Sequence, residues 1–387
     1  MAAEGAMDAD AGVRSGRVLV VGGPPWSEDI NQPATQMATA LADLGYEVTY
    51  LCRPRQSSWL RGVGGRGRGR RTSQSADGVR VEHLTGIAEL LPMTAPGIRL
   101  LQLRLLRRTV SALERRNGPY DLTLLYWWFF PELVPDLPGV VLYDAVDEHH
   151  AYPSNAGRTR HNARTLVWEG RTARAAAGVA AVSQASVHRL RAHHEGVRWL
   201  PNSIDLKRLA GLREELDAVQ QVPSRVGYGG GVGPRVDWEL IRFLADARPQ
   251  YEFSFAGGGP HPSDLPANVH FLGAATYTEV LRHIASSAVT VVPFVDDEFT
   301  RGSDFLKAYD YLAVGRVVVA SQLPALGRLR DLFPTHVLLP QDRDEWLSAL
   351  DEVLLRNDVR PVPDVSSLGT QVRARALLAL ALSGDAR

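Results

Sequence analysis

The segment 288–321, AVTVVPFVDDEFTRGSDFLKAYDYLAVGRVVVAS, contains a complete strand–loop–helix–strand unit. A β-branched run at 289–292 predicts a strand, and the apolar residues that follow the loop recur at helical spacing. A second apolar run, at 317–320, predicts the next strand. This order is the repeating unit of parallel α/β sheets, whose ligands bind at the carboxyl ends of the strands. The polar loop 296–304 is therefore a candidate ligand site.

The helix of this unit is predicted to begin at Ser303 or Asp304, each a good N-cap residue. Its free backbone N–H groups favour a phosphate at the loop. Lys307 lies in the first turn and neutralises the same anion, while Asp310, one turn later, is placed to accept hydrogen bonds from a ribose. The predicted phosphate-binding residues of this unit are Ser303, Asp304, Phe305, Leu306 and Lys307.

The string SDFLKAYDYLAVGRVVVAS resembles the donor-binding segment of glycosyltransferase family 4 enzymes. In that family, two glutamates separated by seven residues usually hold the donor, the second on the ribose and the first on the transferred sugar. The second position is Asp310 here, and the first is Gly302. The resemblance therefore implies that Asp297, Glu298 or Asp304 supplies the carboxylate that grips the sugar, or that the cleft does not catalyse transfer.

Length and composition fit a globular protein of two domains. The chain has 387 residues, of which 45% are hydrophobic and 22% charged, with 43 basic and 43 acidic side chains. Cys52 is the sole cysteine, so an intrachain disulfide is impossible and a reducing cytoplasm is the expected compartment. Residues 1–16 lack the basic start and apolar run of a signal peptide. No apolar run approaches the roughly 20 residues that span a bilayer.

The chain opens with a predicted strand at 17–21, a loop that contains Gly22, Gly23 and Trp26, then a helix and a second strand at 47–52. This opening, with the string LADLGYEVTYL, resembles the first unit of GT-B, the glycosyltransferase fold with two Rossmann-like domains. Gly22 and Gly23 could instead indicate a dinucleotide site, but the spaced third glycine of the nicotinamide fingerprint is missing. A dehydrogenase is therefore disfavoured.

Two basic segments follow. Residues 53–71 carry seven arginines and five glycines without an acidic residue, so we expect a loop that is either solvated or in contact with an anionic membrane or a phosphorylated acceptor. Residues 98–116 form a predicted basic amphipathic helix, whose apolar face packs on the core or lies on lipid. Relatives in the family that glycosylate lipid-linked acceptors use a similar helix. Nucleic-acid motifs are lacking, so no nucleic-acid partner is expected.

A polar cluster follows the predicted strand 140–143. Asp144, Asp147 and His149 are the candidate catalytic residues, because a carboxylate or an imidazole there could orient or deprotonate an acceptor hydroxyl. The string YDAVDE resembles a pattern of family 4 enzymes from cell-envelope and polysaccharide synthesis. Two alternatives stay open: a metal site of Asp147, His149 and His150, and carboxylates that only cap the next helix.

The string PNSID at 201–205 resembles the P-N-G-V-D signature that closes the first domain of family 4 enzymes. We therefore predict an acceptor-binding Rossmann-like domain at 17–203 and a nucleotide-sugar-binding Rossmann-like domain at 204–365. Residues 366–387 contain an apolar helix that, in GT-B proteins, commonly crosses back to the first domain.

The second domain opens with a strand that runs into glycines, which let a backbone approach a diphosphate closely. Its predicted diphosphate-binding residues are Gly230, Gly231, Gly233 and Arg235, with Lys307 as the second cation. The string NVHFLG resembles a later family strand whose end contacts the nucleobase. It indicates a base site at Leu272 and Gly273, with Tyr277 either beside the base or in a surface turn.

These observations predict an α/β protein of GT-B fold, with two Rossmann-like domains whose parallel sheets face a central cleft. The resemblance implies a hexosyltransferase-like enzyme that moves a sugar from a nucleotide-diphosphate sugar, such as a UDP- or GDP-sugar, to a hydroxyl of a sugar, lipid-linked or small-molecule acceptor. It also implies anomeric retention, no metal and no further cofactor. The acidic pair Asp296–Asp297 could suggest the metal-dependent GT-A fold, but it lies too late in the chain. A non-catalytic partner subunit of another transferase and a nucleotide-sugar 2-epimerase are the alternatives.

Overall fold

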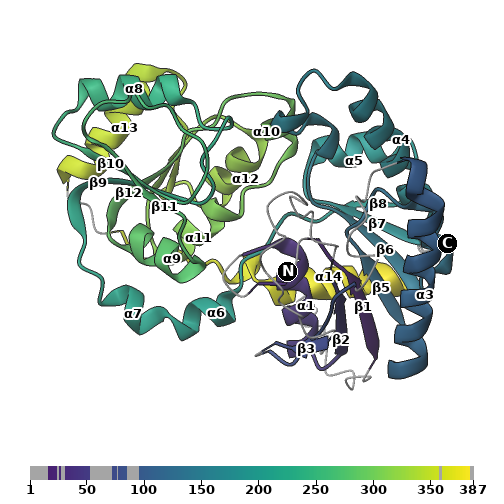
Figure 1. Ribbon diagram of the computed structural model, residues 1–387. Coiled ribbons are helices and arrows are strands. Elements are labelled where there is room, and N and C mark those ends of the chain that lie inside the picture. Colours follow the sequence, from purple (N-terminus) through teal and green to yellow (C-terminus); the bar gives the residue numbers. More distant parts are fainter. Residues whose placement is uncertain are drawn as a thin grey trace, which may run out of the picture.

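The computed structural model describes residues 16–23, 26–27, 31–52, 72–75, 77–84, 96–356 and 360–383. These residues form two β-sheets, each covered by helices, which lie in two halves of the molecule (Figure 1). The first half comprises the N-terminal part of the chain together with the last helix. The basic segment 53–71 lies outside the described residues.

The first sheet has eight strands in the order β3-β4-β2-β1-β5-β6-β7-β8. All neighbouring pairs are parallel except β3 and β4, which are antiparallel. The strands are β1 (Arg17–Val21), β2 (Glu47–Leu51), β3 (Thr72–Gln74), β4 (Arg80–Glu82), β5 (Leu122–Leu125), β6 (Val140–Ala145), β7 (Gly178–Ala181) and β8 (Val197–Trp199). The helices of this half are α1 (Pro33–Asp43), α3 (Arg99–Asn117), α4 (Thr159–Ala175) and α5 (Gln184–Leu190). Strands buried on both faces explain the continuous apolar runs of β1 and β5.

The second sheet has six parallel strands in the order β11-β10-β9-β12-β13-β14. The strands are β9 (Val222–Gly229), β10 (Glu252–Ala256), β11 (Val269–Gly273), β12 (Ser287–Val292), β13 (Val318–Ala320) and β14 (Val337–Leu338). The helices are α8 (Trp238–Ala247), α9 (Tyr277–Ala285), α10 (Glu298–Gly302), α11 (Leu306–Val314), α12 (Pro324–Leu332) and α13 (Arg343–Arg356). The strand order reverses at β9, where a parallel α/β sheet opens a crevice for a ligand.

The segment 288–321 forms the predicted unit of β12, loop, helix and β13, but its helix starts later than predicted. Asp297 caps the short helix α10, because its carboxylate accepts a 2.8 Å hydrogen bond from the Thr300 N–H while the Thr300 hydroxyl bonds back to Asp297. This capping box takes the place of the predicted caps. Ser303 therefore ends α10, and α11 begins only at Leu306.

The two halves are joined by α6 (Leu206–Gly211) and α7 (Arg213–Asp217), and by α14 (Thr370–Leu382), which returns to the first sheet (Figure 1). Ala374, Leu377 and Leu380 of α14 share one hydrophobic core with α1 and with strands of the first sheet. The last helix is thus part of the core of the first half, and its apolar face replaces water on that side of the sheet.

A buried ion pair fixes α14 in this position. Arg373 of α14 donates two 2.8 Å hydrogen bonds to the carboxylate of Asp144 at the end of β6, and its Nε donates to the carbonyl oxygen of Pro201. The two side chains are 4% and 0% exposed. Asp144 is therefore a structural residue, which corrects its prediction as an acceptor-side base: both carboxylate oxygens already serve a guanidinium that carries a permanent charge.

The predicted amphipathic helix is α3, which buries Leu103, Leu106, Val110 and Leu113 against the first core. Three of its arginines form ion pairs with carboxylates of the same half, namely Arg99 with Glu132, Arg107 with Asp136 and Arg116 with Glu82. Leu100, at its start, is 74% exposed. Contact of this helix with a membrane stays a prediction. Among the described residues, no helix combines the length and apolarity needed to cross a bilayer.

Candidate active site

A cavity of about 320 Å³ opens at the carboxyl ends of β9 and β10. Its walls come mainly from the glycine loops that follow these strands, from α9 and from α11. The lining residues are Asn31, Gly229, Gly230, Gly231, Gly257, Gly258, Ala274, Ala275, Tyr277, Val280, Leu281, Ile284, Leu306, Lys307, Asp310 and Tyr311. A Cβ at Gly257 would lie 2.1 Å from the carbonyl oxygen of Gly230, and Gly257 has a φ of +147°. Only glycine allows the two loops to approach this closely.

Lys307 brings a cation to the glycine loop. A Cβ added to Gly230 would lie 3.3 Å from Lys307 Nζ, and that nitrogen lies 4.0 Å from the centroid of the Tyr228 ring. Burial lowers the pKa of Lys307 well below its usual value, and the nearby positive charge of Arg235 lowers it further. Lys307 Nζ and Arg235 Cζ lie 4.7 and 5.6 Å from the centroid of the same Phe294 ring, so an anion at the glycine loop would meet positive charge from both side chains.

Asp310 of α11 is the carboxylate of the cavity. It is 7% exposed, and its Oδ1 accepts a 2.7 Å hydrogen bond from the Tyr277 hydroxyl. Burial raises the pKa of Asp310 to about 7, against hydrogen bonds from Tyr277 and Asn31 that lower it. The structure therefore brings Asp310 and Tyr277 together at one end of the cavity, with the glycine loop and Lys307 at the other.

Asp147 belongs to the first half and follows the end of β6. Burial raises its pKa to about 6, and the positive charge of Arg235 opposes this rise. Arg235 thus lies close enough to affect both Asp147 of the first half and Lys307 of the second. A carboxyl group that titrates near neutral pH is suited to accept a proton. His149, half-buried in the turn that follows, lies with its ring 5.4 Å from the ring of Trp128.

Three residues of the predicted loop site have side chains that are buried in the protein. The Ser303 hydroxyl donates to the carbonyl oxygen of Phe299, and the Asp304 carboxylate accepts hydrogen bonds from the Asn202 N–H and the Tyr309 hydroxyl. Both polar side chains therefore point into the protein, and phosphate binding by the backbone N–H groups of this loop stays a prediction. Phe305 also has a buried side chain.

Asp297 and Glu298 also have contacts of their own, and their role as substitutes for the sugar-binding carboxylate stays a prediction. Asp297 caps α10, and Glu298 Oε1 lies 3.0 Å from His150 Nε2, in a contact that crosses between the two halves. Asp297 therefore stabilises the loop, and Glu298 contributes to the contact of the loop with the first half.

Gly302 lies buried against Glu148 of the first half. A Cβ at residue 302 would lie 2.2 Å from Glu148 Cγ. Glu148 itself accepts a 2.6 Å hydrogen bond from the Ser186 hydroxyl and pairs with Arg189 at 2.8 Å. The position at which the family usually has a glutamate therefore has no room for a side chain, because a first-domain carboxylate occupies it.

We expect that restoring the glutamate by Gly302→Glu lowers stability and gives no gain in activity. The new side chain would overlap Glu148 and place a second carboxylate beside it, so the cost of overpacking alone is about 1–3 kcal/mol. Thermal unfolding of Gly302→Ala and Gly302→Glu measures this cost. Gly327→Ala is the matched control, because a Cβ there meets no atom within 4 Å and helix α12 should be unchanged or slightly more stable. A Gly302→Glu protein as stable as the unmodified protein would contradict the packing described.

Of the predicted base-binding residues, one lines the cavity and two do not. Tyr277 lines the cavity, whereas Leu272 is 60% exposed and Gly273, with a φ of +77°, turns the chain at the end of β11. Ala274 and Ala275, which the sequence did not indicate, line the cavity instead. Their small side chains leave room for a flat ring beside the backbone.

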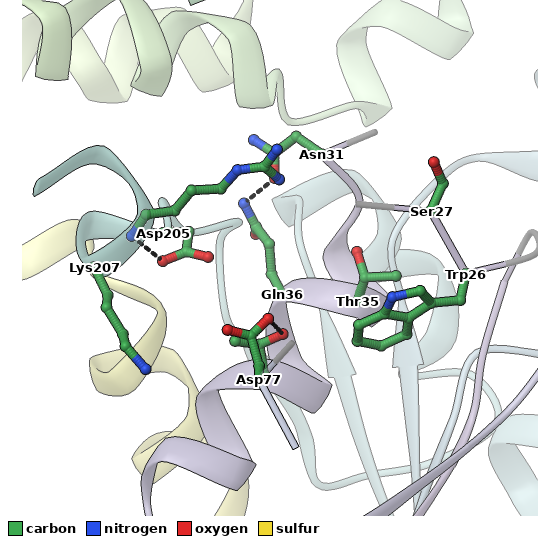
Figure 2. A pocket seen from close by; sticks show the side chains of 10 residues that line it. Trp26, Ser27, Asn31, Thr35, Gln36, Asp77, Asp205 and Lys207 are labelled. Carbon is green, nitrogen blue, oxygen red and sulfur yellow. Dashed lines mark hydrogen bonds between the residues drawn. The ribbon is translucent and has the colours of Figure 1, made fainter. Parts of the chain in front are cut away.

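The first-domain loop borders a second, polar cavity of about 300 Å³ (Figure 2). Its lining residues are Trp26, Ser27, Asn31, Thr35, Gln36, Thr39, Asp77, Asp205, Lys207 and Arg208. Trp26 packs edge-on against Tyr50, with ring centroids 5.1 Å apart. Gly22 has no room for a side chain beneath that tyrosine, whereas Gly23 is open. Asn31 lines both cavities.

The described part of the chain contains no arrangement of side chains that fits the alternative of a metal site. Within these residues, no group of three or more His, Cys, Asp or Glu side chains is placed to hold a metal ion. His150 lies near Glu148 and Glu298 in the contact between the halves. The expectation that the reaction needs no metal and no further cofactor stays a prediction.

Comparison with known proteins supports the fold. No family model matches the chain. The chain is 22% identical to TuaH of Bacillus subtilis (strain 168), which carries the provisional name of a teichuronic acid biosynthesis glycosyltransferase. This match extends over 186 residues, which is 44% of the chain and 45% of TuaH, so the chain spans about half the length of that relative. The sucrose-phosphate synthase of Thermosynechococcus elongatus aligns with 96% of the chain and 97% of its own, at a TM-score of 0.60 and 18% identity.

The catalytic domain of starch synthase IV from Arabidopsis thaliana, solved with ADP and acarbose, aligns at a TM-score of 0.60 and 11% identity. The alignment covers 97% of this chain and 100% of that one. Together with the two parallel sheets, these alignments show that the chain has the GT-B fold. The predicted fold class is confirmed.

Proposed function

We propose that this chain is a glycosyltransferase of family 4 type, which transfers a sugar from a nucleotide-diphosphate sugar to an acceptor hydroxyl with retention and without metal. The similarity to TuaH and the GT-B fold support the transferase class. The resemblance of the segment around Asp310 to the family's donor site supports the finer assignment. The donor is a UDP- or GDP-sugar in this proposal.

One observation carries the proposal: Arg235 lies near Lys307 of the donor cavity and near Asp147 of the opposite half. A diphosphate at the glycine loop would contact both cations, and a sugar attached to it would extend toward Asp147. The two halves therefore bring leaving-group binding and an acceptor-side carboxylate to the same point of the cleft.

Each residue then has a distinct chemical role. Lys307, Arg235 and the backbone N–H groups of Gly230 and Gly231 stabilise the charge that develops on the leaving diphosphate when its bond to the sugar breaks. Asp310 accepts hydrogen bonds from the ribose. Asp147 orients or deprotonates the acceptor hydroxyl, and its raised pKa suits that task.

The acceptor in this proposal is a saccharide of an envelope polysaccharide or its lipid-linked precursor. The name of TuaH, which refers to teichuronic acid biosynthesis, supports this class. The exposed Leu100 at the start of α3 supports contact of residues 98–116 with a membrane surface. The segment 53–71 would add positive charge to such a contact.

Incubation of the purified protein with a panel of UDP-, GDP-, ADP- and dTDP-sugars tests the proposal. We expect slow release of free nucleoside diphosphate from at least one donor, because water replaces the acceptor at a low rate. A saccharide or lipid-linked acceptor should accelerate that release. Binding of a nucleotide without any turnover would instead support the non-catalytic partner subunit, and conversion of the donor sugar to its 2-epimer would support the epimerase.

A further inference from the structure

Asp310 contacts the first half as well as its own domain. Asn31, which precedes α1, directs its Nδ2 to Oδ1 and Oδ2 of Asp310, at 3.5 and 3.4 Å. The two residues are 279 positions apart in the chain. The carboxylate that would bind the ribose is thus contacted by a residue from across the cleft, in addition to Tyr277 from α9.

The orientation of the Asn31 amide is determined by a second hydrogen bond. Gln36 Nε2 donates to Asn31 Oδ1 at 2.6 Å, a contact that Figure 2 shows on the first-domain side of the polar cavity. Because Oδ1 accepts this bond, the amide nitrogen must face Asp310. Gln36 is itself buried in α1, so the pair of hydrogen bonds from Gln36 through Asn31 to Asp310 begins on a helix.

We propose that Asn31 is a positioning residue that couples closure of the two domains to recognition of the donor ribose, by holding the Asp310 carboxylate ready to accept the ribose hydroxyls. This inference rests on the proposed role of Asp310 in donor binding. A carboxylate has about four acceptor sites, two on each oxygen; Oδ1 receives contacts from Tyr277 and Asn31 and Oδ2 receives one from Asn31, so at least one site on Oδ2 stays open. The ribose can therefore bind while Asn31 stays in place.

The charge state of Asp310 links this contact to pH. The groups that face it are Tyr277 on α9, Arg208 on α6 and Asp205 at the N-cap of that helix, Tyr311 beside it on α11, and Asn31. Burial raises the pKa of Asp310 to about 7, and the Asn31 hydrogen bond is one of the contacts that hold it down. Loss of that bond raises the pKa further, so that near pH 7 more of the carboxyl group is protonated and cannot accept two hydroxyl donors.

The experiment measures binding of UDP and GDP by calorimetry at pH 7.0 and pH 9.0, and compares each variant with the unmodified full chain at the same pH. This ratio cancels the titration of the nucleotide's own phosphates. We expect Asn31→Ala to weaken binding about ten-fold at pH 7.0 and only about two- to three-fold at pH 9.0, where Asp310 is ionised with or without Asn31. Asn31→Asp should remain weak at pH 9.0, because its carboxylate repels Asp310.

Thr39→Val is the matched control. Thr39 lines the same polar cavity from α1, but its hydroxyl lies 3.5 Å from Asp77 and away from Asp310. The Thr39→Val protein should bind UDP and GDP as tightly as the unmodified protein at both pH values. An Asn31→Ala protein with unchanged affinity, or with the same deficit at both pH values, would overturn the proposal.

Asp310→Asn separates this inference from the function on which it rests. If Asp310 binds the ribose, this variant should bind the nucleotide weakly at both pH values. Unchanged affinity would refute the donor-site assignment itself. Weak binding by Asp310→Asn together with full affinity in Asn31→Ala would refute only the role of Asn31.

Discussion

Replacement of Arg373 by alanine should lower the free energy of unfolding by about 3–5 kcal/mol, one of the largest effects that a single substitution can have in this chain. The substitution leaves the Asp144 carboxylate fully buried without its guanidinium partner, and it also removes the bond to the Pro201 carbonyl. Denaturant-induced unfolding, followed by tryptophan fluorescence, measures the effect.

Two controls distinguish the buried pair from any loss of charge. Arg213→Ala removes one partner of an exposed pair with Asp217 on α7, so we expect a cost below about 0.5 kcal/mol. The double variant Asp144→Leu/Arg373→Met removes both buried charges and should recover much of the stability that Arg373→Ala loses. If Arg373→Ala were as stable as Arg213→Ala, the ion pair would not hold α14 on the first sheet.

Replacement of Lys307 by methionine should reduce kcat for sugar transfer by about 10²–10³-fold. Methionine keeps the length of the side chain and its packing over Tyr228, but it removes the cation beside the leaving diphosphate. Steady-state assays of nucleoside diphosphate release measure this loss. Lys207→Met is the control, because Lys207 is the only other lysine in the sequence and its exposed side chain pairs with Asp43.

Proton uptake on nucleotide binding is an independent test of the contact between Lys307 and the diphosphate. Burial and the positive charge of Arg235 lower the pKa of Lys307, whereas a bound diphosphate favours the ammonium and raises that pKa. Calorimetry at pH 8.5 in buffers of different ionisation enthalpy should therefore show proton uptake when UDP or GDP binds. At that pH Asp310 is already largely ionised and contributes little. Equal uptake by Lys307→Met would contradict this role of Lys307.

The sequence was sufficient to predict the fold because most central strands of the two sheets are short apolar runs between turn residues, whereas the edge strand β3 (Thr72–Gln74) and its neighbour β4 (Arg80–Glu82) carry no such run and were not predicted. The unit of β12, α11 and β13 follows directly from its periodicity, and Gly315 ends α11 in a left-handed conformation, as expected of a C-terminal glycine. Lys307 and Asp310 were found for the same reason: their spacing from the start of the helix places both in one cavity.

The details that the sequence did not predict depend on partners far along the chain. Asp144 was predicted as a catalytic base because it follows a buried strand, but Arg373, 229 residues later, engages both of its oxygens. Gly302 suggested a missing carboxylate, whereas the structure shows that Glu148 occupies the space. Neither contact leaves a local signal, because nothing near either residue indicates which distant side chain will face it.

Competition between local signals explains the misplaced start of the helix. Asp297, Ser303 and Asp304 are all good N-cap residues, and the sequence alone gave no reason to prefer the first. The reciprocal bonds between Asp297 and Thr300 form a capping box, whose N-cap residue lies six residues before Ser303, the first predicted cap. The polar groups of Ser303 and Asp304 are then free to bond inward, away from the donor cavity.

A structure of the protein with UDP or GDP bound tests the central claim most directly. The claim predicts the diphosphate at Gly230 and Gly231 within hydrogen-bond distance of Lys307 Nζ, and the ribose hydroxyls on the Asp310 carboxylate. A nucleotide bound outside the cavity between β9, α9 and α11, or a cavity that stays empty at a saturating concentration of each nucleotide, would contradict it.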